Sequence, residues 1–171
     1  MVWRGNLTAI DRFWGGLVYL LPMTQVVVFG VFLFARLPFL RYIFLPILQL
    51  AQLLSFPLIE GFIDLYFVLF VCLYALVVRD WRIKHFIRFS TMQSLLLSIG
   101  LYLILLVVRL IGATNLFELV PNSLLFYLAE LFASTLFIGM NGVCLYAIVQ
   151  AVRGRYAEMP IISSAAYYQV G

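Results

Sequence analysis

The chain is 171 residues long, carries a formal net charge of +4 and is 65% hydrophobic, with a mean hydropathy of +1.11. Only 11% of its residues are charged, whereas a soluble domain carries about 25%. Because a soluble fold could not bury this much apolar surface, the composition excludes a soluble protein. It predicts an all-α protein that folds in lipid as a single membrane domain over residues 1–171.

The first apolar segment covers residues 13–35, and any bend in it is expected at Pro22. It is long enough for a transmembrane helix, which needs about 20 residues. The next segment, residues 40–56, is interrupted by Pro46, and its polar residues recur at near-helical spacing. This pattern predicts an amphipathic helix in the membrane interface rather than a crossing. Its polar residues are Gln49, Gln52 and Ser55.

Three further spans are predicted over about residues 57–78, 92–112 and 124–149, followed by a tail at 153–171. With four spans, the N-terminus, the loop 79–91 and the tail share one side of the membrane. That side holds eight basic residues, against three on the other side. The positive-inside rule then places both termini inside, and a crossing by residues 40–56 would largely remove the bias. The three outer basic residues are Arg36, Arg41 and Arg109.

Polar side chains recur inside the predicted spans. On a helix, Glu60 and Asp64 share one face of the second span, because they are four residues apart. A carboxylate at mid-membrane costs about 2.5–3.5 kcal/mol, so these groups are expected to face protein or water in a polar seam between the helices. The candidate seam residues are Glu60, Asp64, Ser98, Arg109, Glu130, Ser134 and Asn141.

Three interpretations of this seam stay open. The polar groups can be contacts that hold the helices together, with the carboxylates paired to the outer arginines. They can instead line a hydrated path for a substrate, or form a proton or ion site.

The basic loop and tail form a second candidate region, on the inner side. A positively charged surface suits anionic lipid headgroups, although the insertion rule alone also produces one. The candidate docking residues are Arg82, Lys84, His85, Arg88, Arg153, Arg155 and Tyr156.

The sequence shows no sign of catalytic chemistry. His85 is the one histidine, too few for a histidine-based metal site, and Cys72 and Cys144 lie in apolar runs where small core residues are expected. We find no Walker A loop, no zinc-binding H-E-x-x-H and no nucleophile–base pair. We therefore expect a protein that is not an enzyme, with no cofactor, no metal and no nucleic-acid partner.

Two stretches resemble the signature segments of one family: "HFIRFSTMQSLLLSIGLYL" (residues 85–103) and "VQAVRGRYAEMPIISSAAYYQV" (residues 149–170). The stretch "DRFWGGLVYLLPM" (residues 11–23) is similar to that family's entry into its first span. The family is the twenty-kilodalton subunit family of the translocon at the inner envelope membrane of chloroplasts, with its cyanobacterial and plastid-encoded homologues. Ser90 and Ser164 depart from its pattern, and residues 36–56 resemble it loosely.

This resemblance implies a four-helix membrane protein of the plastid inner envelope or the cyanobacterial plasma membrane, with both termini on the stromal or cytoplasmic side. It also implies a channel or channel-partner role in preprotein import, with other translocon subunits and a translocating preprotein as partners. Four helices are few to enclose a polypeptide, so an oligomer or a heteromeric complex is expected. The alternatives are a small solute or ion transporter, or a membrane scaffold without transport activity.

Overall fold

The computed structural model describes residues 7–59, 63–110, 124–160 and 162–170. This part of the chain is mostly helical, which agrees with the predicted fold class. Three of its helical stretches are long and apolar enough to cross a membrane, namely Ala9–Arg36, His85–Val108 and Leu124–Val152. They correspond to the predicted first, third and fourth spans. The candidate seam residue Glu60 and the side chain of Arg109 lie outside the described residues.

The first span is not one regular helix. It consists of α1 (Ala9–Leu17), α2 (Leu20–Val26), the 3-10 helix η1 (Val27–Gly30) and α3 (Val31–Arg36). Thr8 and Asp11 form a capping box that starts α1. The turn between α1 and α2 lies one turn before Pro22, because proline lacks the N–H that would bond to the carbonyl of Val18.

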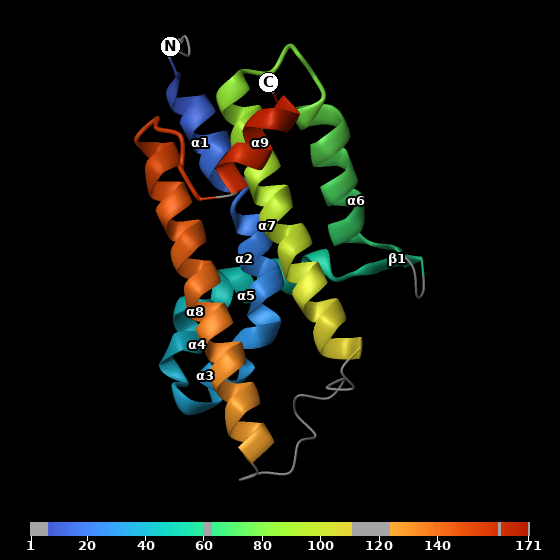
Figure 1. Cartoon of the computed structure of the whole chain (residues 1–171), viewed down its shortest axis with the longest axis vertical. Helices are drawn as coiled ribbons and strands as arrows, with labels where there is room; N and C mark the ends of the chain where they lie inside the picture. Colours follow the sequence, from blue (N-terminus) through green and yellow to red (C-terminus); the bar gives the residue numbers. More distant parts are fainter. Residues whose placement is uncertain (1–6, 60–62, 111–123, 161, 171) are drawn as a thin grey trace.

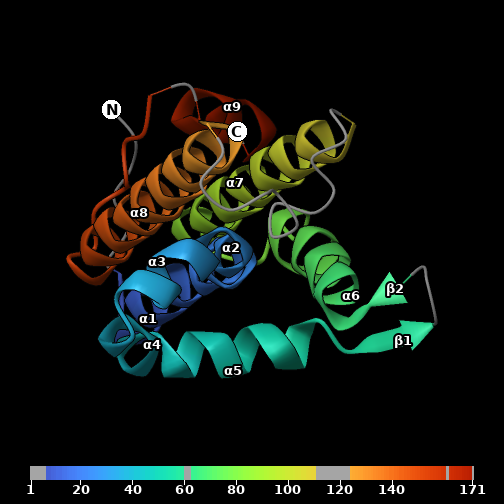
Figure 2. The ribbon, with the colours of Figure 1, turned by 90° about the horizontal axis from the view of Figure 1, so that it is seen from below.

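The predicted interfacial helix is two short helices, α4 (Phe39–Ile43) and α5 (Leu45–Leu54). Pro46 stands in the first turn of α5, where a proline is tolerated because that N–H has no partner within the helix. Figure 2 shows α5 lying across the long axis of the helix bundle. Gln49, Gln52 and Ser55 are all exposed.

The prediction of a helix over residues 57–78 is wrong at its start, where residues 57–59 and 63–64 are strands. Strands β1 (Pro57–Ile59) and β2 (Ile63–Asp64) form an antiparallel pair, and α6 (Leu65–Cys72) begins only after Asp64. The Asp64 carboxylate accepts a hydrogen bond from the Phe67 N–H at 2.8 Å, so it caps α6 instead of lying within a helix. Asp64 therefore lies before the helix rather than on one of its faces, and its predicted partner Glu60 lies outside the described residues.

A π-helix, η2 (Leu73–Val78), continues α6. Together they have 14 residues, or about 21 Å at 1.5 Å per residue. The hydrocarbon core of a bilayer is about 30 Å thick. Helices α6 and η2 therefore form a shorter segment at the side of the bundle, and they are not counted with the three long spans.

The first span lies at the centre of the bundle, in contact with α7 (His85–Leu110) and with α8 (Leu124–Val152). Helix α6 packs against α5, and η2 packs on α7. The last helix, α9 (Ile162–Val170), lies against α7. The start of α1, the start of α7, the end of α8 and all of α9 gather at one end of the bundle (Figure 1), which we call the terminal end.

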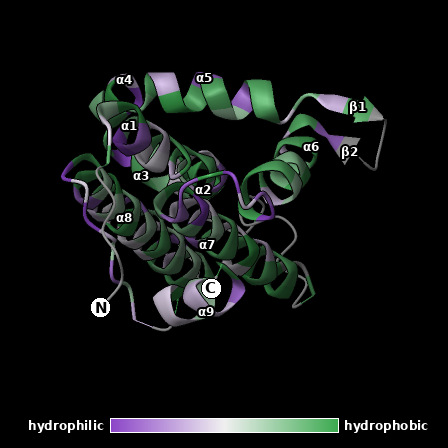
Figure 3. Cartoon of the chain, turned by 90° about the horizontal axis from the view of Figure 1, so that it is seen from above, coloured by the Kyte–Doolittle hydropathy of each residue, from purple (hydrophilic) through white to green (hydrophobic). Residues whose placement is uncertain are grey.

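Apolar residues fill the interior and also cover the outside. Val26, Phe89 and Cys144 are fully buried. Large hydrophobic side chains stand exposed on the outward sides of the helices, as expected where lipid replaces water. Figure 3 shows hydrophobic residues along the helices and hydrophilic ones mainly in the connections.

Candidate functional site

The buried polar groups of α7 form a network that the sequence analysis did not single out. Gln93 is completely buried, and its Nε2 donates to the carbonyl oxygen of Ala157 at 2.9 Å and to Oγ of Ser163 at 2.8 Å. Its Oε1 accepts a hydrogen bond from the Tyr19 hydroxyl at 2.7 Å. Gln93 therefore joins the first span, α7 and the C-terminal segment through three hydrogen bonds.

Ser163 completes this network. Its Oγ accepts from the Met159 N–H at 2.6 Å and donates to the Ala157 carbonyl at 3.2 Å. The C-terminal segment is thus folded onto α7. Of the candidate docking residues, Tyr156 lies in this fold too: its hydroxyl is 3.2 Å from Nδ1 of His85, and its ring packs on Phe89 with 5.1 Å between ring centroids.

Ser94, the residue that follows Gln93 in α7, contacts the irregular part of the first span. Its Oγ donates to the carbonyl oxygen of Val18 at 2.6 Å. That carbonyl is the one that Pro22 cannot satisfy, and it also accepts a longer bond from the Leu21 N–H at 3.2 Å. The Ser94 hydroxyl therefore supplies the hydrogen bond to Val18 that Pro22, which has no N–H, cannot make.

Two predicted seam residues, Asp64 and Ser98, lie near one cavity. This cavity of about 300 Å³ is walled by α2, η1, α5, β2, α6 and α7, and Asp64 and Tyr66 line it. The Tyr66 hydroxyl lies 2.9 Å from Oγ of the buried Ser98 and 3.2 Å from Oε1 of Gln25. Nε2 of Gln25, which also lines the cavity, is buried and has no hydrogen-bond partner among the described residues. A buried donor left unpaired costs about 1–3 kcal/mol.

The seam residues of α8 lie in a different place. Glu130 accepts a hydrogen bond at 2.8 Å from Nη2 of Arg36, at the end of the first span. The Glu130 side chain is 13% exposed and the Arg36 side chain 65%, so the pair is at the edge of the bundle. Asn141 is buried and donates to the Phe137 carbonyl of its own helix at 2.8 Å, while Ser134 is half-buried.

The predicted seam residues that are described therefore form two groups. Asp64 and Ser98 adjoin the cavity between α6 and α7, whereas Glu130, Ser134 and Asn141 line α8 where it meets the first span. The pairing of Glu130 with Arg36 is the arrangement that the packing interpretation of the seam expects.

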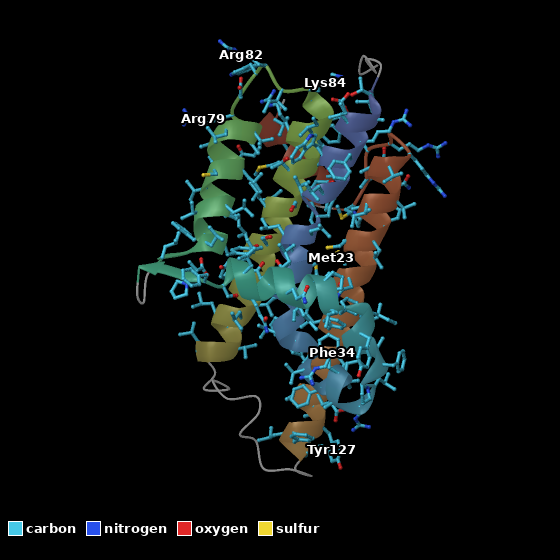
Figure 4. The ribbon with its side chains drawn as sticks, turned by 180° about the vertical axis from the view of Figure 1, so that it is seen from behind. Met23, Phe34, Arg79, Arg82, Lys84 and Tyr127 are labelled. Carbon is cyan, nitrogen blue, oxygen red and sulfur yellow. The ribbon has the colours of Figure 1, made fainter. Side chains whose placement is uncertain are left out.

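The basic docking candidates divide into tied and exposed side chains. Lys84 forms an ion pair with Asp11, and Nε of the buried Arg88 donates to the Val78 carbonyl at 2.9 Å. The Arg88 guanidinium also lies 5.3 Å from the ring centroid of Trp81, which is 82% exposed. The exposed candidates are Arg82, Arg153 and Arg155. Figure 4 shows Arg79, Arg82 and Lys84 together at the terminal end, far from Tyr127.

Sequence reasoning missed Tyr19, Gln93 and Ser163 as partners. The available signal was a glutamine inside an apolar stretch, because an amide in a lipid-embedded helix needs hydrogen-bond partners from neighbouring elements. The sequence could not identify those partners, which lie 74 and 70 residues away.

Comparison with known proteins identifies the family of the chain. The sequence profile described as "Chloroplast import apparatus Tic20-like" matches residues 11–166. The chain belongs to the Tic20-like family. The resemblance drawn from the sequence is thereby confirmed, and the matched range includes Tyr19, Gln93 and Ser163.

Two relatives carry the same family name. A Tic20 family protein of Synechocystis sp. (strain ATCC 27184 / PCC 6803 / Kazusa) is 38% identical over 161 residues, which cover 94% of this chain and 92% of the relative. The Tic20 family protein Ycf60 of Gracilaria tenuistipitata var. liui is 30% identical over 173 residues, covering 96% and 78%. Tic20-like membership and the apolar helices together point to a multi-pass membrane protein of plastid or cyanobacterial membranes.

Proposed function

We propose that this protein is an integral membrane subunit of a preprotein-import translocon, in the plastid inner envelope or the cyanobacterial plasma membrane. The observation that carries this proposal is the match of the import-apparatus family over residues 11–166. The proposal assigns no catalytic role to the chain. Its partners are other translocon subunits and the preprotein in transit.

Within such an assembly, we propose the role of channel partner rather than of a channel within one chain. The described part of the interior is filled by large side chains, such as Phe29, Phe89 and Leu95, each at most 3% exposed. A cavity of about 300 Å³ lies at the side of the bundle. This packing favours a polypeptide path that runs along the outside of the bundle and is completed by partner chains.

The proposal includes an orientation. The chain runs away from the terminal end along the first span, returns along α6 and η2, leaves again along α7 and returns along α8 (Figure 1). This course supports four passes, with α6 and η2 as a short second pass. The terminal end, with its exposed arginines, would face the stroma or cytoplasm. There, Arg82, Arg153 and Arg155 would contact anionic lipid headgroups or partner subunits.

Site-specific photocrosslinking tests the proposal. A photoreactive amino acid would replace Phe67 on α6 or Leu131 or Ile138 on α8, all more than half exposed, with the buried Leu95 as the interior control. In membranes that hold an arrested preprotein, we expect crosslinks to the preprotein or to other subunits from exposed positions and none from Leu95. Absence of crosslinks at every exposed position would contradict the import role. Crosslinks from Leu95 to the preprotein would contradict the path along the outside.

A further inference from the structure

The cavity between α2, α5 and α7 has a wall of mixed polarity. Its wall combines polar groups, Gln25 and Asp64, with apolar ones, Val28, Leu54 and Leu105. A volume of about 300 Å³ is at the lower end of the range for small-molecule sites in proteins, about 300–1,000 Å³.

The cavity wall holds both a hydrogen-bond donor and a hydrogen-bond acceptor that have no partner among the described residues. Nε2 of Gln25 is a buried donor without an acceptor among the described residues. Oδ1 of Asp64 accepts from the Phe67 N–H, and its second oxygen makes no hydrogen bond with the described residues. A ligand that fits must therefore offer an acceptor to Gln25 and a donor to Asp64. Hydroxyl groups do both.

The charge on the cavity wall limits the class of ligand that the cavity can bind. Among the described residues that line the cavity, Asp64 is the one with a charged side chain, and it is acidic. A phosphate or sulfate headgroup would stand beside a carboxylate in a medium of low dielectric, where like charges repel strongly. An uncharged headgroup does not meet this repulsion.

The surroundings of the cavity indicate how a ligand would arrive. Val28, on its wall, is 52% exposed, and Leu53 and Phe67, next in sequence to wall residues, are 61% and 51% exposed. In a membrane this rim contacts acyl chains. A molecule entering from the bilayer would leave its own chains against Val28 and Leu105 while its headgroup reaches Gln25 and Asp64.

We propose that this cavity binds the headgroup of an uncharged, hydroxyl-rich lipid, such as a glycolipid with a single sugar ring. Gln25 donates to a hydroxyl oxygen of the headgroup, and Asp64 accepts from a hydroxyl group. This binding does not depend on the import role, because it rests on the cavity alone.

Native mass spectrometry of the detergent-purified chain tests the proposal. The protein would be mixed with equal amounts of monoglycosyl diacylglycerol and phosphatidylglycerol that carry identical acyl chains. We expect the glycolipid to be retained about tenfold more strongly, a difference that a single well-placed polar contact can produce. Equal retention of the two lipids, or preference for phosphatidylglycerol, would overturn the proposal.

Variants separate the contributions of the two polar residues. Gln25→Leu should lower glycolipid retention about tenfold, whereas Gln49→Leu, at an exposed glutamine of α5 outside the cavity wall, should leave it unchanged. Asp64→Asn keeps a good helix-capping residue and should raise phosphatidylglycerol retention toward that of the glycolipid. Unchanged glycolipid retention in Gln25→Leu would overturn the assignment.

Two further measurements keep the test independent of folding and of the ligand source. Val28→Trp adds bulk at the exposed rim without removing a polar contact and should block glycolipid retention. Full retention would count against the cavity as the binding site.

A soluble methyl glycoside should compete poorly at millimolar concentration, because it lacks the acyl chains. Competition as strong as that of the glycolipid would assign the cavity to a free sugar and overturn the lipid proposal.

Discussion

Oγ of Ser94 donates a hydrogen bond of 2.6 Å to the carbonyl oxygen of Val18, across the interface between α7 and the first span. This carbonyl would bond to the N–H of residue 22 in a regular helix, and residue 22 is a proline. The irregular first span is thus made tolerable in lipid by a hydroxyl group from a neighbouring helix, as occurs at helix breaks in membranes.

This relationship predicts that Ser94 and Pro22 are energetically coupled. Ser94→Ala should destabilise the protein by about 0.6 kcal/mol, the average measured for hydrogen bonds between membrane helices, and by at most about 1.7 kcal/mol, the largest value measured. In a Pro22→Ala background, the restored N–H can bond to Val18, so the same serine substitution should cost less. Unfolding in mixed micelles with a denaturing detergent would measure both. Equal costs in the two backgrounds would contradict the coupling.

The hydrogen bonds of Gln93 predict that this residue holds the C-terminal segment in place. Gln93→Leu keeps a side chain of similar size, but it removes the Gln93 acceptor of the Tyr19 hydroxyl and leaves the Ala157 carbonyl with only the longer hydrogen bond from Ser163. A buried polar group that becomes unpaired costs about 1–3 kcal/mol. We expect faster amide hydrogen exchange over residues 157–170 than in the wild type. The matched control is Gln52→Leu, at an exposed position. Unchanged exchange in Gln93→Leu would show that α9 is held by apolar packing alone.

The ion pair between Arg36 and Glu130 predicts a small effect of its loss. The Arg36 side chain is 65% exposed, and exposed ion pairs contribute little to stability because solvent screens them. Glu130→Gln should therefore change the stability only slightly and leave import activity unchanged, in contrast to the acidic-path interpretation of the seam. Import assays with membranes from the variant strain would check this. A large loss of import with intact folding would restore the acidic path.

Labelling would test the orientation of the bundle. In a Cys72→Ala background, which removes the exposed native cysteine while Cys144 stays buried, cysteines would be placed at Arg82, Arg155 and Tyr127. A membrane-impermeant maleimide should reach Arg82→Cys and Arg155→Cys from one side of the membrane and Tyr127→Cys from the other. Labelling of Arg82→Cys and Arg155→Cys from opposite sides would contradict the arrangement of the terminal end.

Some of the architecture could be predicted because it depends on hydropathy alone. The long apolar runs around Met92 and Phe137 exceed the thickness of the hydrocarbon core, so they form helices whatever their neighbours are. The second span could not be predicted in the same way. Residues 57–64 are apolar enough for a helix, but residues 57–59 pair with residues 63–64 as strands and Asp64 caps α6. Local capping outweighed composition there.

The positions of the polar residues could likewise be predicted only in part. That Ser98, Glu130 and Asn141 would turn away from lipid follows from the cost of exposing polar groups to hydrocarbon. Whether they meet one another depends on helix placement. Because the first span lies between α7 and α8, the polar groups of those two helices are held in separate places rather than in one continuous path.

The amino-acid sequence by itself determined the membrane setting, the three long spans and the family, because each depends on residue type and on order along the chain. Only the tertiary structure decided which groups are neighbours: Gln93 with Tyr19 and Ser163, Ser94 with Val18, and Gln25 with Tyr66. Hydrogen bonds act over about 3 Å. Contacts between residues 40 or more positions apart are therefore fixed by how the helices pack, which no local pattern specifies.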